Sequence, residues 1–148
     1  MKAFALSLLI VALSSTASAA DGMIAKPSKH SVTNTMERLE VAVKEKGLTI
    51  FAKVDHEAGA EKIGLKMPPA QVLIFGNPKG GTPLMLASPS TALDLPLKMA
   101  VWEDGKGKVW LGYNSVSVLK ARHDITGKDE LVKTLDGLLD SLSSKATE

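Results

Sequence analysis

Residues 72–85 read VLIFGNPKGGTPLM, an unbroken apolar run followed by a glycine-rich turn and then by a second apolar run. A short continuous apolar run is typical of a buried strand, which we place over residues 71–75 and expect to be central, with both faces covered. Thr82 and Pro83 are favoured as the N-cap and first residue of a helix. This part of the chain therefore predicts a strand, a glycine-rich loop and a helix in succession.

The glycine-rich loop, residues 76–83, is the main candidate for a binding site. Glycines let backbone N–H groups crowd together, and a helix N-terminus carries partial positive charge, so the two together suit an anion. We expect a small anionic or polar ligand to be held by Lys79, Gly80, Gly81 and Thr82. The competing interpretation is that the glycines serve only a tight connection. The glycine spacing matches a phosphate-binding P-loop, but Thr82 stands where that motif needs its lysine, which argues against ATP or GTP.

Two stretches have the apolar spacing of amphipathic helices. Residues 31–46 place three apolar side chains on one face, and Gly47 suits the left-handed position that ends a helix. Near the C-terminus, Thr126 and Asp129 resemble a capping box that starts a second helix. The apolar stripe of this second helix consists of Leu131, Leu135, Leu138 and Leu142.

Short apolar runs predict a sheet of about five strands. Residues 48–55 alternate apolar with polar side chains, which predicts a half-buried strand with Leu48, Ile50, Ala52 and Val54 on its inner face. Strands over 97–103 and 108–113 flank the hairpin sequence DGKG, and a short strand over 23–26 adds a fifth. Consecutive strands bracketed by helices predict an α+β fold: a single compact domain with helices packed on a mainly antiparallel sheet.

The N-terminus has the three parts of a secretory signal peptide. A short positive start precedes an apolar run over residues 3–13, and small residues then end in ASA at 17–19, which fits the cleavage rule. The apolar run is much shorter than the ~20 residues that span a bilayer as a helix. We therefore predict a signal peptide over residues 1–19, cleaved after Ala19 or Ala20, and a periplasmic domain over residues 20–148 without stable membrane insertion.

Composition excludes several classes of function. The 148 residues have a formal net charge of +2 and include no cysteine, which excludes disulfides, thiol chemistry and thiolate metal sites. Lysines are interleaved with acidic residues rather than gathered on one face, so we predict no nucleic-acid binding. His30, His56 and His123 have no metal-ligand spacing, and we predict neither a metal nor a cofactor.

Several short motifs occur in an order that resembles one known family. They are DHEAGA at 55–60, FGNP at 75–78, GTPLM at 81–85, DLPLK at 94–98, VWED at 101–104, GKVW at 107–110 and YN at 113–114. Together they resemble the domain of unknown function 302 family over nearly the whole predicted mature chain. The resemblance implies a compact α+β domain, often found in exported bacterial proteins, with no established activity to carry over.

Residues 84–97 are a second candidate for function. Apolar residues in this segment are interrupted by three prolines, so the segment can cover the sheet or present an apolar surface to a ligand or a second subunit. We therefore predict a non-enzymatic binding or accessory domain that uses residues 76–83 and 84–97. The alternatives are a structural homodimer module and a weakly marked enzyme in which His56, beside Asp55, acts as acid or base.

Export is directly testable. Protein secreted by a cell that expresses the full chain should begin at Ala20 or Asp21, because cleavage follows the small residues at 17–20. N-terminal sequencing of the periplasmic fraction checks this. Intact protein that begins at Met1 and stays in the membrane fraction would contradict it.

Overall fold

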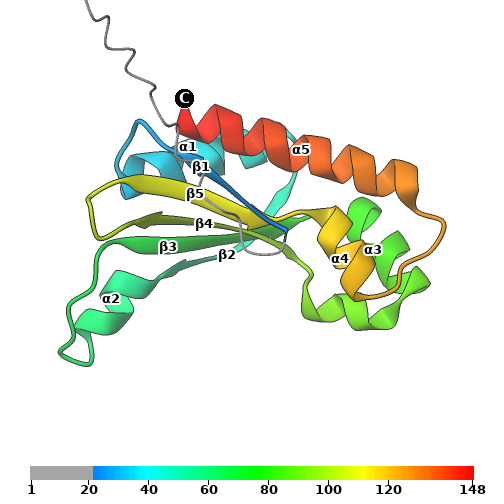
Figure 1. Cartoon of the computed structure of the whole chain (residues 1–148), viewed down its shortest axis with the longest axis horizontal. Helices are drawn as coiled ribbons and strands as arrows, with labels where there is room; N and C mark the ends of the chain where they lie inside the picture. The colour runs from blue at the N-terminus through cyan, green and yellow to red at the C-terminus, as the bar shows by residue number, and fades with distance from the viewer. Residues whose placement is uncertain (1–21) are drawn as a thin grey trace, which may run out of the picture.

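The computed structural model describes residues 22–148 and places five strands in one antiparallel sheet (Figure 1). The predicted signal peptide and its cleavage site lie outside the described residues. The order across the sheet is β1-β5-β4-β3-β2. The strands are β1 Met23–Pro27, β2 Thr49–Asp55, β3 Ala70–Gly76, β4 Leu97–Glu103 and β5 Val109–Asn114. The α+β prediction is confirmed, and so is the hairpin, in which Trp102 of β4 lies opposite Trp110 of β5.

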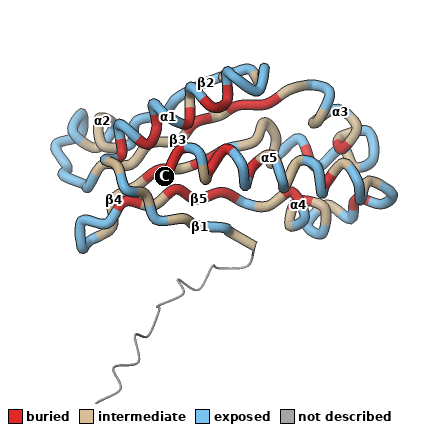
Figure 2. The backbone as a smooth tube through the Cα atoms, turned by 90° about the horizontal axis from the view of Figure 1, so that it is seen from above, coloured by how far each residue is buried: buried red, intermediate tan, exposed pale blue. Residues whose placement is uncertain are grey.

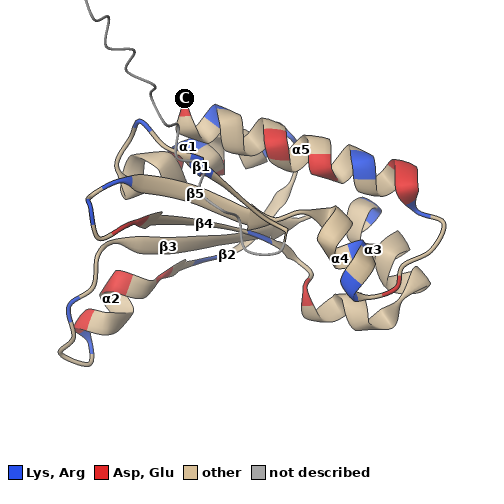
Figure 3. Ribbon diagram, in the orientation of Figure 1, with Lys and Arg blue, Asp and Glu red and all other residues tan. Residues whose placement is uncertain are grey.

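Helices connect and cover the strands. They are α1 Val32–Glu45, α2 His56–Glu61, α3 Pro78–Ala87, the 3-10 helix η1 Pro89–Leu93, α4 Val116–Arg122 and α5 Asp129–Thr147. The two long helices, α1 and α5, pack on the same face of the sheet, and α3, η1 and α4 gather at one end of it (Figure 1). Acidic and basic residues are interspersed along α5 (Figure 3). No helix in residues 22–148 is both long and apolar enough to cross a membrane.

The core lies between the sheet and the two long helices, where buried residues of both layers meet (Figure 2). Alternate residues of β3, β4 and β5 point into it because successive side chains of a strand face opposite sides. The fully buried side chains of this layer include Leu73, Phe75, Met99, Val101 and Leu111 from the sheet, Met36, Leu39 and Val43 from α1, and Leu139 and Leu142 from α5.

The two helices begin differently. The Ser31 side chain accepts a hydrogen bond from the Asn34 N–H, so Ser31 is the N-cap of α1. Helix α5 begins at Asp129 without a side-chain cap, and the predicted capping box with Thr126 is therefore wrong. Gly127 has a positive φ of 67° and turns the chain between Thr126 and the helix. Asp129 instead forms an ion pair with Lys120 of α4.

The prediction that residues 71–75 form a central strand with both faces covered is wrong. Strand β4 is central, and β3 lies between β4 and the edge strand β2. Leu73 and Phe75 are fully buried, whereas Val72 and Ile74 on the opposite face are only partly buried. The reason is that α1 and α5 both lie on the side of Leu73 and Phe75, so the other face receives much less cover.

Strand β2 departs from the predicted alternation. The register shifts between Ile50 and Ala52, so Phe51 is an extra residue in a β-bulge. Beyond the bulge, Ala52 pairs with Ile74 on the outer face, and Lys53 faces the helices and bonds Glu40 of α1 at 2.7 Å. The predicted inner positions of Ala52 and Val54 are therefore wrong, because one extra residue reverses every later side chain.

Two substitutions in β3 test this one-sided burial. Leu73→Ala should lower the free energy of unfolding by about 2–5 kcal/mol, since it opens a cavity in the core. Ile74→Ala should cost less than half as much, because its side chain is already partly in solvent. Denaturant unfolding of both variants measures the difference, and equal losses would contradict one-sided burial.

Candidate functional site

An apolar pocket of about 550 Å³ opens at the end of the sheet where β3 ends and β4 begins. One wall is the start of α3, a second is the N-terminal half of α5, and the segment between η1 and β4 closes a third side. The apolar lining residues are Leu48, Phe51, Leu84, Met85, Ala92, Leu95, Pro96, Leu97, Leu131, Leu135 and Leu138. The arrangement can enclose a small apolar molecule.

The wall formed by α3 begins earlier than its sequence indicates. Helix α3 begins at Pro78 with Asn77 as N-cap, and Pro83 lies inside it, so the predicted start at Thr82 and Pro83 is wrong. The Asn77 side-chain oxygen accepts a hydrogen bond from the Lys79 N–H at 2.8 Å. Asn77 followed by Pro78 satisfies the same N-cap rule as Thr82 and Pro83, and the earlier pair starts the helix. The predicted glycine-rich loop is thus largely helical.

This geometry changes what the predicted ligand residues can do. Lys79, Gly80, Gly81 and Thr82 all line the pocket, so the structure brings them together on one wall. The N–H groups of Gly80 and Gly81 both donate to the Asn77 carbonyl, at 3.0 and 3.1 Å. Because Asn77 already accepts these donors, residues 79–82 contribute surface and side chains to the pocket rather than a ring of free N–H groups.

The two glycines allow α3 to approach its neighbours. A Cβ on Gly80 would lie 3.1 Å from Cδ2 of Leu135, which is a crowded contact with α5. A Cβ on Gly81 would lie 3.5 Å from Cδ1 of Leu95, which is ordinary van der Waals contact. Gly80 therefore sets the distance between α3 and α5, whereas Gly81 leaves room on the pocket side.

The predicted apolar segment, residues 84–97, divides into two parts. Leu84 is fully buried, and Met85, Leu95 and Leu97 line the pocket. By contrast, Leu86 and Leu93 are 81% and 83% exposed. The segment is thus partly a pocket wall and partly an exposed surface.

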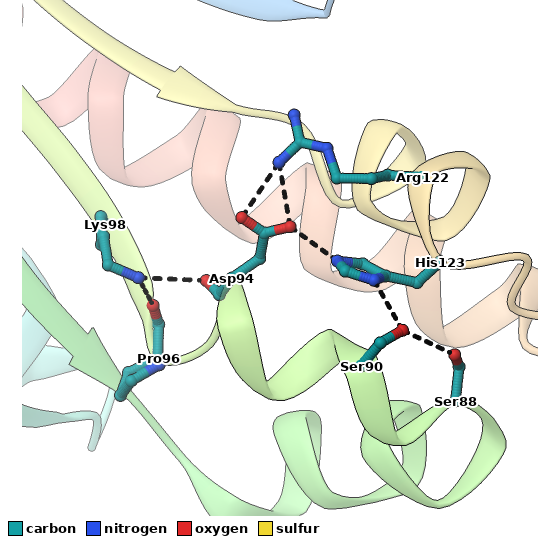
Figure 4. Close-up of polar contacts among 7 residues, drawn as sticks. All are labelled: Ser88, Ser90, Asp94, Pro96, Lys98, Arg122 and His123. Carbon is teal, nitrogen blue, oxygen red and sulfur yellow. Dashed lines mark hydrogen bonds and ion pairs between the residues drawn. The ribbon is translucent and has the colours of Figure 1, made fainter.

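A polar network anchors this segment to α4 (Figure 4). Arg122 donates two hydrogen bonds to the Asp94 carboxylate, at 3.0 and 2.9 Å, and His123 Nε2 lies 2.7 Å from Asp94 Oδ2. The other ring nitrogen of His123 lies 2.9 Å from the Ser90 hydroxyl, and Ser88 extends the chain of contacts. Lys98 donates to the carbonyls of Asp94 and Pro96.

Two opposing effects set the pKa of Asp94. Burial alone would raise the pKa of this carboxyl, but the hydrogen bonds from His123 and Arg122 outweigh it. The positive charge of Arg122 acts in the same direction, so the pKa of Asp94 is lowered below its ordinary value. The network is therefore strongest when Asp94 is ionised.

A serine, a histidine and an aspartate in contact are also the groups of a hydrolase triad. Here the Asp94 carboxylate is shared with Arg122 in a two-point ion pair, which leaves less of its charge to stabilise a protonated His123. Ser90, Asp94 and His123 are also absent from the pocket lining. We interpret the network as a clamp that holds the pocket wall.

The predicted catalytic candidates lie elsewhere. Asp55 caps α2 by accepting the Ala58 N–H at 3.0 Å, and its other oxygen accepts from Gln71. His56 is exposed at the first residue of α2, at the opposite end of the sheet from α3 (Figure 1). The structure therefore does not bring His56 to Asp94 or to the pocket. Within residues 22–148, no three histidine or carboxylate side chains are placed to share a metal ion.

The sequence reasoning missed two parts of the site. Leu131, Leu135 and Leu138 belong to the apolar stripe of the C-terminal helix, for which we predicted no part in a binding site, yet they line the pocket. The sequence did contain a signal for this. The apolar face of the helix is wider than the stripe, and Val132 and Leu139 beside the stripe are the residues that are buried. The pairing of Asp94 with Arg122 and His123 joins segments 28 and 29 residues apart, and no local spacing indicates it.

Comparisons with known proteins agree on the family. A model of the family described as "Domain of unknown function DUF302" matches residues 24–142. A crystal structure of an uncharacterized conserved protein DUF302 from Bacillus stearothermophilus is similar to this chain, with a TM-score of 0.76 at 18% sequence identity. The matched region includes 86% of this chain and 99% of that protein. At this identity, the likeness shows the fold alone.

Curated relatives are longer proteins. The fluoride-specific ion channel FluC 1 of Brucella suis biovar 1 (strain 1330) is 45% identical over 104 residues, which is 70% of this chain. FluC 1 of Brucella abortus biovar 1 (strain 9-941) matches to the same extent. The chain spans 41% and 38% of the lengths of these two relatives.

The clamp predicts a pH-dependent stability. Because Asp94 has a lower pKa in the folded protein than in the unfolded chain, its contribution is fully present above about pH 5 and is lost as the pH falls through the lowered pKa. Asp94→Asn should therefore lower the free energy of unfolding by about 1–3 kcal/mol at pH 7, the range for hydrogen bonds to charged groups. The loss should shrink at pH 3.

Urea unfolding at both pH values measures this difference. Asp124→Asn is a matched control, because Asp124 is exposed on the same turn and asparagine tolerates its positive φ of 50°. A loss from Asp94→Asn that is equal at pH 7 and pH 3 would show that the ionised carboxylate does not hold the clamp.

Proposed function

We propose a binding function for this chain, which belongs to the Domain of unknown function DUF302 family. In this proposal the protein is an exported, non-enzymatic domain that takes up a small and largely apolar molecule. The molecule lies between α3, α5 and the segment between η1 and β4. The observation that carries the proposal is the pocket at this end of the sheet.

The size and lining of the pocket support binding. Its volume of about 550 Å³ lies within the ~300–1,000 Å³ typical of small-molecule sites, which are mostly apolar with a few polar groups. Burying apolar surface of a ligand there removes it from water at about 25 cal/mol per Å². An apolar ligand therefore gains more from this site than a compact polar one.

The polar residues of the pocket favour binding over catalysis. Asn77, Lys79 and Thr82 line the pocket, together with apolar residues and glycines. In the part of the chain that the structure describes, no histidine or carboxylate lines the pocket to act as acid or base beside them. His56 and Asp55, the candidates of the enzyme alternative, lie at the other end of β2, and Asp55 is occupied in capping α2.

The accessory part of the proposal draws on the longer relatives. In the proteins named as fluoride-specific ion channels, the region like this chain is joined to further sequence. We do not extend fluoride binding to this pocket, because an apolar lining cannot replace the hydration of a small anion. Export rests on the N-terminal sequence pattern alone.

The homodimer alternative is favoured by a different surface. Ile63 and Leu65, between α2 and β3, are 73% and 60% exposed, and Trp102 and Trp110 are only partly buried on the outer face of the sheet. Exposed apolar surface of this kind is typical of interaction sites. Sedimentation of the mature protein distinguishes a monomer from a dimer, independently of ligand binding.

Binding is tested with N-phenyl-1-naphthylamine, a neutral apolar dye whose fluorescence rises when it leaves water. The mature protein should bind the dye, and Gly81→Leu should weaken binding at least about tenfold because the added side chain occupies the pocket. Gly81→Ala is the matched control, since its Cβ fits at ordinary contact distance. Thermal unfolding checks that both variants fold. Equal dye binding by the wild type and a folded Gly81→Leu variant would exclude this pocket.

A further inference from the structure

We infer that the ligand is an amphiphilic anion, an apolar chain that ends in a carboxylate or a similar acidic head, with its head at Lys79. This inference rests on the proposed function of the same pocket and adds the chemical class of the ligand. Three features of the lining carry it: the sign of its charge, the position of its polar residues and the engagement of its backbone donors.

The charge of the lining has one sign. Among the described residues that line the pocket, Lys79 is the only charged one. Within residues 22–148, the Lys79 side chain has no ion-pair partner, whereas Lys26, Lys53, Lys120 and Lys145 are all paired. An acidic ligand group therefore meets a cation that is not already neutralised, and it meets no carboxylate in the lining that would repel it.

The polar residues lie at one side of the pocket. Asn77, Lys79 and Thr82 all belong to the start of α3, from its N-cap to its second turn. The facing walls contribute leucines from α5 and Leu95, Pro96 and Leu97 from the segment that leads into β4. A ligand that is polar at one end and apolar along the rest matches this division, whereas a ligand that is polar all round would leave polar groups against leucine.

The backbone donors at the start of α3 are already engaged, so side chains must bind the head group of the ligand. Asn77 accepts hydrogen bonds from the N–H groups of Lys79, Gly80 and Gly81, so these donors already have acceptors within the chain. The interaction with an acidic head therefore falls mainly to the ammonium group of Lys79. Lys79 is exposed, and an ion pair with an exposed lysine is weak. We therefore expect Lys79 to determine which head group is preferred, whereas the apolar chain supplies most of the affinity.

The experiment compares decanoate, dodecanoate and tetradecanoate, each below its micelle concentration, with decanol and dodecanol, each below its solubility limit, by isothermal titration of the mature protein. Affinity should rise about fourfold with each added methylene until the pocket is full. Dodecanoate should bind more tightly than dodecanol. Raising the salt concentration should weaken dodecanoate and leave dodecanol unchanged, because salt screens exposed charges.

Substitution of Lys79 distinguishes the contribution of the acidic head to the affinity from that of the apolar chain. Lys79→Gln should weaken dodecanoate about three- to fivefold and leave dodecanol within a factor of two, and Lys79→Arg should restore most of the loss. Lys106→Gln, an exposed lysine in the hairpin between β4 and β5, is the matched control and should change neither affinity.

The outcomes separate this inference from the proposed function. If dodecanol binds as well as dodecanoate and Lys79→Gln changes neither, the anionic head is excluded while the apolar pocket stands. If the naphthylamine dye and all five amphiphiles fail to bind, both the proposed function and this inference are overturned. If the dye binds and the amphiphiles do not, the pocket takes a different class of apolar molecule and this inference alone is wrong.

Discussion

The burial of one face of the sheet under α1 and α5 is the interaction on which the rest of the structure depends. Leu73, Met99 and Leu111 from three neighbouring strands have no exposed surface beneath these helices. Each edge strand also contributes a lysine that faces the helices and pairs with a helical carboxylate: Lys53 of β2 bonds Glu40, and Lys26 of β1 bonds Asp140, each at 2.7 Å. An ion pair therefore lies at each edge of the apolar layer.

The same layer explains why a pocket exists at one end. Helix α5 has 19 residues and is about 28 Å long, whereas strands of 6–7 residues extend about 20–23 Å. One end of α5 therefore projects past the strands, and the figures show its N-terminal half above α3 and α4 (Figure 1). The leucines on this half, Leu131, Leu135 and Leu138, are only partly buried against the core. They line the pocket, whose opposite wall is the start of α3.

Local patterns allowed much of the fold to be predicted. Helix α1 and the β4–β5 hairpin depend on neighbouring residues, and both were predicted correctly. The bulge at Phe51 and the partial exposure of Ile74 depend on which elements pack on each face, so periodicity alone did not indicate them. The start of α3 was ambiguous in a different way, since the sequence contains two successive N-cap and proline pairs.

The site was predictable only where a single segment forms it. Residues 79–82 were predicted as ligand residues because their glycines and Lys79 are adjacent in the sequence; they lie in one wall of the pocket, although the backbone donors of residues 79–81 serve Asn77. The opposite walls needed contacts between distant segments, including the clamp of Asp94 with Arg122 and His123. This clamp fixes the segment before β4 by hydrogen bonds and charge, whereas Leu84 fixes α3 by burial. Both walls are therefore held by the protein itself, so a ligand of the proposed kind would enter a site that is already formed and would lose less affinity to ordering it.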